Sequence, residues 1–356
     1  MKKLLHILLI AALFASCHQD EPINPTPEEC PIQFGDVQTR AAVENADDID
    51  SFGVWAWVNL GDEGEAAAAD FISLLEAEAV SRVGSTNDWT YTNTRYWVPE
   101  RVFRFVGIYP FGAGTFTDGK ITTDQITQGG VVYDRVMIDF ETPETADNDL
   151  LFATTVMPTK TPGVDYTNDG VDNPYNYPTA VDMNFQHALS KVTINVTPHE
   201  TNVNDHFKIV SAKMTNITRN GTFGVASTGA TLWIPSTGKM NFTRDYGEGK
   251  LLENDVGVDI TEPVFDSKLL VPQSNLNNIS LSIEYLYCHS TGNPADDADW
   301  QEKGGSLTFP AGEWVMGRSY SYTIVLTETN IIYIRTLDVD VPSWGEDGSG
   351  ATIIIK

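Results

Sequence analysis

A histidine followed by a glutamate is the nearest approach in this sequence to a catalytic metal site. His199 and Glu200 begin like the HExxH pattern, in which two histidines bind zinc and the glutamate acts as general base. The next residues are Thr201, Asn202 and Val203, so the second histidine ligand is missing. No nucleophile elbow, phosphate-binding loop or GxGxxG pattern occurs elsewhere. We therefore expect neither enzymatic activity nor a cofactor.

One further histidine and the cysteines favour structural roles. His187 lies just before an apolar, strand-like run, where we expect a structural side chain. Cys17, Cys30 and Cys288 lack the spacing of a zinc site. Cys30 and Cys288 could form one disulfide, but their segments differ in apparent role, so we favour Cys288 as a core thiol.

An acidic segment gives a partial match to a cation site. Asp165, Thr167 and Asp169 stand at alternate positions before Gly170, as at the start of a calcium-binding loop. The twelfth position is Asn176, so the bidentate glutamate of such loops is missing. These residues are a weak calcium candidate, and a solvated loop is the favoured interpretation.

Eight tryptophans raise the alternative of a surface that stacks on sugar rings. All but one lie in or beside expected strands, where a tryptophan normally packs in the core. Trp300 lies in an acidic loop region and is the weak candidate for an exposed ligand contact. The ligand itself stays unassigned.

The first residues resemble a bacterial export signal with a lipid attachment site. Two lysines precede the apolar run Leu4–Phe14, which is too short to span a bilayer as a stable helix. Leu13–Cys17 then resembles a lipoprotein box, so we expect residues 1–16 to be removed and Cys17 to carry lipid in the outer membrane. Each buried methylene would contribute about 0.8 kcal/mol to that anchor. An ordinary secretory signal with an incidental cysteine is the alternative.

The bulk composition is that of a folded protein with an acidic surface. The 356 residues are 41% hydrophobic and 20% charged, which suggests about two domains. The formal net charge of -27 makes nucleic acid a poor partner, because its phosphates would be repelled. It also argues against electrostatic binding to anionic lipid.

Most of the chain beyond the signal is predicted to form β-strands. Short runs of β-branched and aromatic residues alternate with turn residues, which is typical of an all-β protein. A segment rich in Pro, Asn, Asp and Tyr, Pro158–Pro178, precedes the expected domain boundary. We predict two consecutive antiparallel β-sandwich domains, residues 41–183 and 184–356, after a tether and first strand at 17–40. The expected strands include Phe52–Val58, Trp89–Trp97, Lys191–Val196, Thr231–Ile234 and Ile331–Val339.

One segment departs from the strand pattern. Ala66–Val80 has high helix propensity, with Phe71, Leu74, Leu75 and Glu78 spaced three and four apart. This predicts a short helix on a loop of the first domain, although the last part would also suit a strand.

Several runs, taken in order, resemble one family. They are Trp89–Tyr91 with Arg95–Trp97, Asp149–Ala153, Phe185–Val192, Leu270–Gln273, Trp314–Leu326 and Val341–Trp344. In this order and spacing they resemble the fimbrillin superfamily of Bacteroidales, the type V pilus subunits and their Mfa-like relatives. The resemblance implies two transthyretin-like β-sandwiches and export as a lipoprotein.

The resemblance also implies processing and assembly. An arginine-specific surface protease would cut between Arg40 and Ala41, removing Cys17–Arg40 with Pro31–Arg40 as its strand. A strand from a like or related pilus subunit would then fill the open groove. The expected donor residues are Ala351, Thr352, Ile353, Ile354 and Ile355, with or without Ile331–Val339. The bland alternatives are a solvated loop arginine at Arg40 and an ordinary last strand within its own domain.

Two functions follow from these expectations. The first is a structural subunit of a cell-surface fimbria, which begins as an outer-membrane lipoprotein and serves in adhesion. The second is a surface lipoprotein or pilus-tip adhesin that binds a glycan or protein without polymerising.

Overall fold

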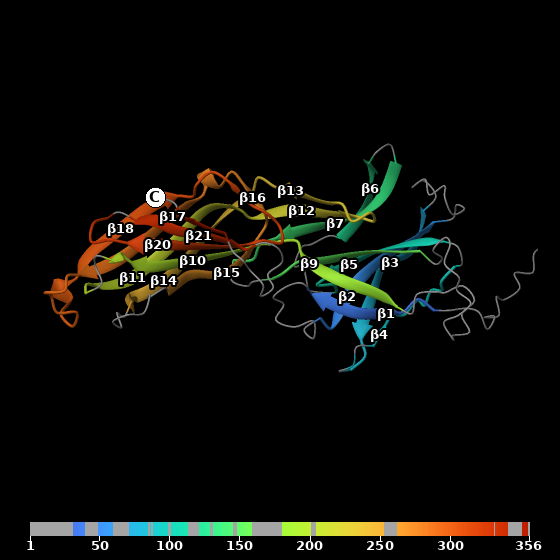
Figure 1. Cartoon of the computed structure of the whole chain (residues 1–356), viewed down its shortest axis with the longest axis horizontal. Coiled ribbons are helices and arrows are strands. Elements are labelled where there is room, and N and C mark those ends of the chain that lie inside the picture. The colour runs from blue at the N-terminus through green and yellow to red at the C-terminus, as the bar shows by residue number, and fades with distance from the viewer. Residues whose placement is uncertain are drawn as a thin grey trace, which may run out of the picture.

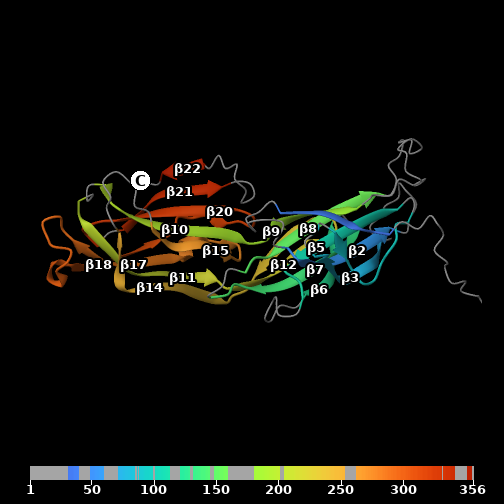
Figure 2. The same cartoon turned by 90° about the horizontal axis from the view of Figure 1, so that it is seen from below.

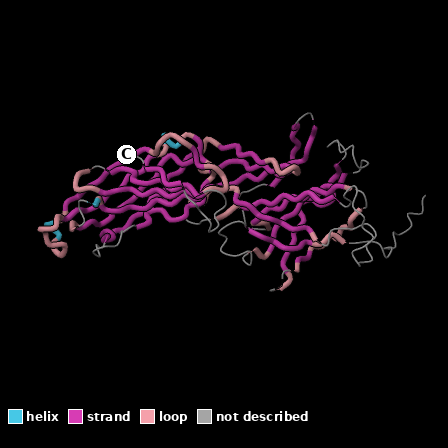
Figure 3. Tube along the Cα trace, viewed as in Figure 1, coloured by secondary structure: helices cyan, strands magenta, loops and turns pink. Residues whose placement is uncertain are grey.

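The computed structural model is an elongated molecule made almost entirely of strands (Figures 1 and 3). It describes residues 31–39, 49–59, 71–84, 86, 88–98, 101–112, 121–128, 131–144, 148–158, 180–200, 204–252, 262–330, 332–340 and 351–354. The predictions for Cys17, Cys30, Arg40 and Ala41, and for Asp165, Thr167 and Asp169, fall outside these residues.

A seven-stranded sheet forms the centre of the N-terminal sandwich, in the order β1-β9-β8-β5-β2-β3-β4. Its strands are β1 (Phe34–Thr39), β2 (Ser51–Asn59), β3 (Phe71–Arg82), β4 (Trp89–Thr90), β5 (Val102–Tyr109), β8 (Leu151–Pro158) and β9 (Val181–His187). The sheet curls until its edges meet, since Pro31 before β1 forms a bridge with Tyr96 after β4. Phe52, Phe105 and Phe185 belong to the core that fills the curl.

A four-stranded sheet, β13-β12-β7-β6, covers the outer face of the seven-stranded sheet. Its strands are β6 (Ile121–Gln128), β7 (Val131–Glu141), β12 (Asn220–Ala226) and β13 (Thr231–Pro235). Trp55 and Val106 of the first sheet meet Ile138 and Phe223 of the second in a shared core.

The C-terminal sandwich packs a five-stranded sheet, β15-β10-β20-β21-β22, against a four-stranded sheet, β14-β11-β17-β18. The five-stranded sheet contains β10 (Ser190–Pro198), β15 (Glu262–Leu270), β20 (Ser319–Leu326), β21 (Ile332–Asp340) and β22 (Ala351–Ile354). The four-stranded sheet contains β11 (His206–Thr218), β14 (Lys239–Leu252), β17 (Ser280–Cys288) and β18 (Gln301–Thr308). Strands β16 (Gln273–Ser274) and β19 (Glu313–Trp314) form a small pair, and η4 (Leu276–Asn278) and η5 (Asp297–Asp299) are single 3-10 turns.

The all-β prediction is confirmed, with two differences in detail. Two of the pairs, β1–β9 and β10–β20, are parallel. The helix predicted in Ala66–Val80 is wrong over its described part, because Phe71–Arg82 is strand β3. It pairs along β2 from Phe71 opposite Asn59 to Ser81 opposite Ser51. Register shifts and a positive φ of 53° at Ala77 break the two-residue alternation, which leaves a spacing that imitates a helix.

The chain crosses between the sandwiches more than once. β9 leads into β10, and β11 leads into β12, whose hairpin with β13 returns to pair with β7 of the first half. Thr231–Ile234, expected in the second domain, therefore completes the first sandwich. The division at residues 183 and 184 stays a prediction, and this hairpin shows that the halves share a sheet.

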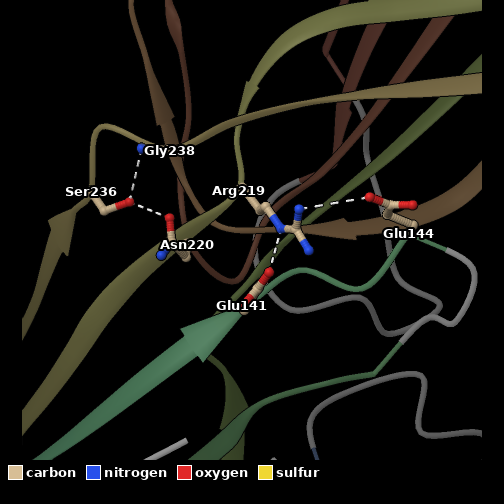
Figure 4. Close-up of polar contacts among 6 residues, drawn as sticks. All are labelled: Glu141, Glu144, Arg219, Asn220, Ser236 and Gly238. Carbon is tan, nitrogen blue, oxygen red and sulfur yellow. Dashed lines mark hydrogen bonds and ion pairs between the residues drawn. The ribbon is translucent and has the colours of Figure 1, made fainter. Parts of the chain in front are cut away.

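Arg219 occupies the crossing between β11 and β12 (Figure 4). Its guanidinium forms ion pairs with Glu141 and, at 3.7 Å, with Glu144, while its backbone N–H donates to the Gly238 carbonyl. The Thr142 N–H donates to the Arg219 carbonyl at 2.8 Å. These side chains are partly exposed, so the backbone bonds fix the crossing more firmly than the ion pairs.

Candidate functional site: the seat of strand β1

Strand β1 lies at one edge of the seven-stranded sheet, beside β9 (Figure 1). The two strands are parallel, with Phe34 opposite Val181 and Val37 opposite Met183. The Val181 N–H donates to the Gln33 carbonyl at 2.8 Å. β1 and the two residues before it, Ile32 and Gln33, lie within Pro31–Arg40. The sequence predicts this segment as the resident strand.

Three side chains of this segment fill the curl of the sheet. Ile32, Phe34 and Val37 are 1%, 4% and 8% exposed. Phe34 meets the rings of Phe52, Tyr91 and Phe105 edge-on, with centroids 5.6–6.1 Å apart. Burial of such side chains contributes about 1.5–3 kcal/mol each, so this short edge strand is a large part of the local core.

A clasp formed by residues 91–97 holds the other side of the segment. The Ile32 N–H donates to the Arg95 carbonyl at 2.8 Å, and the Tyr91 hydroxyl donates to the Ile32 carbonyl at 2.9 Å. Burial raises the pKa of Tyr91. The strand expected over Trp89–Trp97 therefore stops at Thr90, and the remainder grips Ile32 from the side opposite β9.

Glu78 of β3 fixes the shape of this clasp. Its Oε1 accepts the backbone N–H groups of Thr92 and Asn93, and its Oε2 accepts Asn93 Nδ2 at 2.8 Å. Burial alone would raise the pKa of Glu78, but these hydrogen bonds together with Arg95 lower it. The ionised carboxylate is therefore the form that holds the clasp.

Replacing Glu78 with glutamine is expected to lower the urea midpoint near pH 7 and to have a smaller effect near pH 3. A carboxylate whose pKa falls on folding stabilises the fold above its unfolded pKa, about 4.3, and this stabilisation is lost as pH drops through the folded pKa. Glutamine has one oxygen and cannot accept all three bonds. Glu76→Gln on the same strand is the matched control, because Glu76 is exposed. Equal midpoints for both variants across this pH range would contradict the role of Glu78.

The predicted donor segment lies at an edge of the other sandwich. β22 pairs with β21 of its own chain, with Thr336 opposite Ile354 and Val339 opposite Ala351, and forms the outer strand of the five-stranded sheet (Figure 2). This pairing is what we expect if residues 351–354 are an ordinary last strand of their own domain. The donor role of Ala351, Thr352, Ile353 and Ile354 stays a prediction, and Ile355 lies outside the described residues.

The other sequence candidates are not part of the seat of β1. Trp300 follows η5 and is partly exposed, but Lys208 Nζ lies 4.2 Å from its ring centroid and so occupies a face needed for stacking. Cys288 is fully buried with a free thiol whose pKa is raised by burial, as expected for a core thiol. His187 is 3% exposed and its Nδ1 lies 2.6 Å from Asp149 Oδ2, in keeping with a structural role.

The described residues contain neither a metal-binding cluster nor a membrane-spanning helix. Within them, no group of three or more His, Cys, Asp or Glu side chains is arranged to hold a metal ion. Among the same residues there is no helix with the length and hydropathy of a membrane span.

The clasp and Glu78 are the parts of the seat that sequence reasoning missed, since nothing in Thr92-Asn93 signals a distant carboxylate partner.

Comparison with known proteins identifies a family and similar solved structures. The fimbrillin-like family matches residues 39–344. A fimbrial protein from Bacteroides vulgatus has a TM-score of 0.57 at 14% identity, with 88% of this chain and 99% of that chain covered. A candidate cell adhesion protein from Bacteroides uniformis has a TM-score of 0.45 at 15% identity, covering 89% and 100%. No curated protein matches the chain. Since the family match spans most of the sequence, the chain belongs to the fimbrillin-like family.

Proposed function

We propose that this chain is a subunit of a cell-surface fimbria that serves in adhesion. It is exported as a lipoprotein through Cys17, cut between Arg40 and Ala41 by an arginine-specific surface protease, and assembled by strand exchange with like or related subunits. One observation carries the proposal. The segment that such a cut would free places three buried apolar side chains in the core from an edge position.

Removal of β1 would leave a defined acceptor groove. Phe52 and Phe105 would lose their contact with Phe34, and β9 would present unpaired backbone groups along one side. An incoming extended segment restores both the ladder and the packing. Three reburied side chains correspond to about 4.5–9 kcal/mol before ordering costs, and the restored backbone hydrogen bonds to β9 add to this.

The residues proposed as donor lie in β22, which pairs with β21 at an edge of the other sandwich. A strand that leaves one subunit and enters the groove of the next makes a head-to-tail contact. Such a contact does not close on itself, so its repetition builds a filament. The cost of release is limited, because β22 is a short edge strand with one partner among the described strands.

Protein recovered from the cell surface is expected to begin at Ala41, and Arg40→Ala is expected to keep the N-terminus at lipidated Cys17 and to abolish polymer. N-terminal sequencing and electron microscopy measure the two outcomes. Arg318→Ala, an exposed arginine in the other sandwich, is the matched control. A lipidated Cys17 on all wild-type material would overturn the proposal.

Deleting residues 351–356 should leave a folded monomer that cannot extend a fibre, and polymer from that variant would refute the donor assignment.

The second candidate function is a surface lipoprotein or tip adhesin that binds a glycan or protein without polymerising. The pairing of β22 with β21 favours it, because a strand already paired in its own sheet has no need of a second subunit. The same N-terminal sequencing separates the two candidates.

A further inference from the structure

The seat of β1 also limits which strand can occupy it. We propose that it selects an extended segment with the pattern apolar–x–large apolar–Gly–x–apolar, and that this segment comes from a different protein chain and not from a second copy of this one. The inference rests on the proposed strand exchange, and it narrows the strand donor from a like or related subunit to a related one.

The apolar positions of the pattern follow from burial and register. Ile32, Phe34 and Val37 enter the core. Between Phe34 and Val37 the segment has one residue more than β9 has between Val181 and Met183, so a bulge sets the final spacing to three.

The glycine follows from the space beside Gly35. A Cβ at this position would lie 2.7 Å from the Ala180 Cβ and 2.8 Å from Asp182 Oδ1. Asp182 is exposed and its carboxylate can turn away. The Ala180 Cβ is attached to backbone that cannot retreat easily, because the neighbouring Val181 is fully buried and its N–H is bonded to Gln33. Side chains on consecutive strand positions point to opposite faces, so any residue that follows the occupant of the Phe34 pocket meets this contact.

The strands at the C-terminal end of this chain do not satisfy the pattern. Ile332, Ile334 and Leu337 repeat the spacing of Ile32, Phe34 and Val37, but Arg335 stands where the seat requires glycine. Residues 351–356 contain no glycine at all. A second copy therefore offers a strand of suitable spacing with a long side chain at the position of closest approach, and a related chain with glycine there would fit.

Peptide exchange on the full chain tests the pattern. A site for a sequence-specific protease is inserted within residues 41–48, the chain is cut, and fluorescent peptides are added to displace the resident segment. Residues 31–39 as a free peptide should exchange in, and the same peptide with Gly35→Ala should bind at least about tenfold more weakly, since overpacking a fixed contact is costly. The peptide 331–339 should bind weakly, and its Arg335→Gly variant at least about tenfold more tightly.

The arms of the experiment separate the possible failures. Ala180→Gly in the receiving chain should restore binding of the Gly35→Ala peptide, which identifies the contact as the cause. Equal binding of the native 31–39 peptide and its Gly35→Ala variant, or of peptides 331–339 and 31–39, would overturn the selection while leaving strand exchange intact. If even the native 31–39 peptide fails to exchange, strand exchange itself is refuted and the selection with it.

Discussion

Replacing Phe34 with alanine is expected to lower the free energy of unfolding by about 3–5 kcal/mol, the range for removing a buried aromatic ring. The ring is 4% exposed and has three edge-on aromatic neighbours, each pair adding to the simple burial. The cavity cannot close easily, because β9 and the clasp hold the segment from both sides. Urea unfolding followed by tryptophan fluorescence measures the change.

Gln33→Ala is the matched control for this variant, since Gln33 is exposed and immediately precedes Phe34. We expect its effect to lie within about 0.5 kcal/mol, as for ordinary surface substitutions. A loss for Phe34→Ala as small as that expected for Gln33→Ala would mean that the segment contributes little to the core, and the acceptor groove would lose its physical basis.

In the C-terminal sandwich, Trp314→Ala is expected to lower the free energy of unfolding by about 3–5 kcal/mol. Its side chain is 1% exposed, packs edge-on against Phe309 and donates from Nε1 to the Tyr322 hydroxyl at 2.8 Å. Burial raises the pKa of Tyr322 to about 12, so its hydroxyl stays neutral and loses a buried partner when the indole is removed. The free energy of unfolding again measures the effect.

Two further variants resolve this loss into its parts. Glu313→Ala, on the exposed neighbour in β19, should change little. Trp314→Phe should keep most of the packing and lose the hydrogen bond, and adding Tyr322→Phe should recover part of that loss because both polar partners are then gone. A Trp314→Phe variant as unstable as Trp314→Ala would show that ring packing is not the main contribution.

The local strand pattern was predictable from sequence, and the pairing was not. Val192, Ile194 and Val196 alternate with polar residues, which indicated a half-buried strand, and β10 buries these three. Its parallel partner β20 lies more than a hundred residues later, and no local pattern reports such a partner. The helix prediction failed for the same reason, since tertiary pairing with β2 outweighed the propensity of Phe71–Val80.

The candidate site divides in a similar way. Ile32, Phe34 and Val37 were recognisable as a strand, and they are buried. Glu78 appeared only as part of a helical spacing, and no sequence pattern marked Gly35, because the residues that both of them contact come from other segments. The role of a residue that acts through contact with a remote segment cannot be predicted from the residues next to it in the sequence.

The hairpin β12–β13 has a consequence for biosynthesis. β7 ends at Glu141 and pairs with β6 just before it, yet its other partner, β12, begins at Asn220. The four-stranded sheet therefore stays unfinished until the ribosome has released the chain through Pro235. Until then Val136 and Ile138 lack Phe223 as a neighbour. Such late, non-local pairing slows folding and leaves an open strand edge in the nascent chain. The first sandwich is therefore complete only after β12 and β13 have been made, and a truncated N-terminal half would be a poor independent unit.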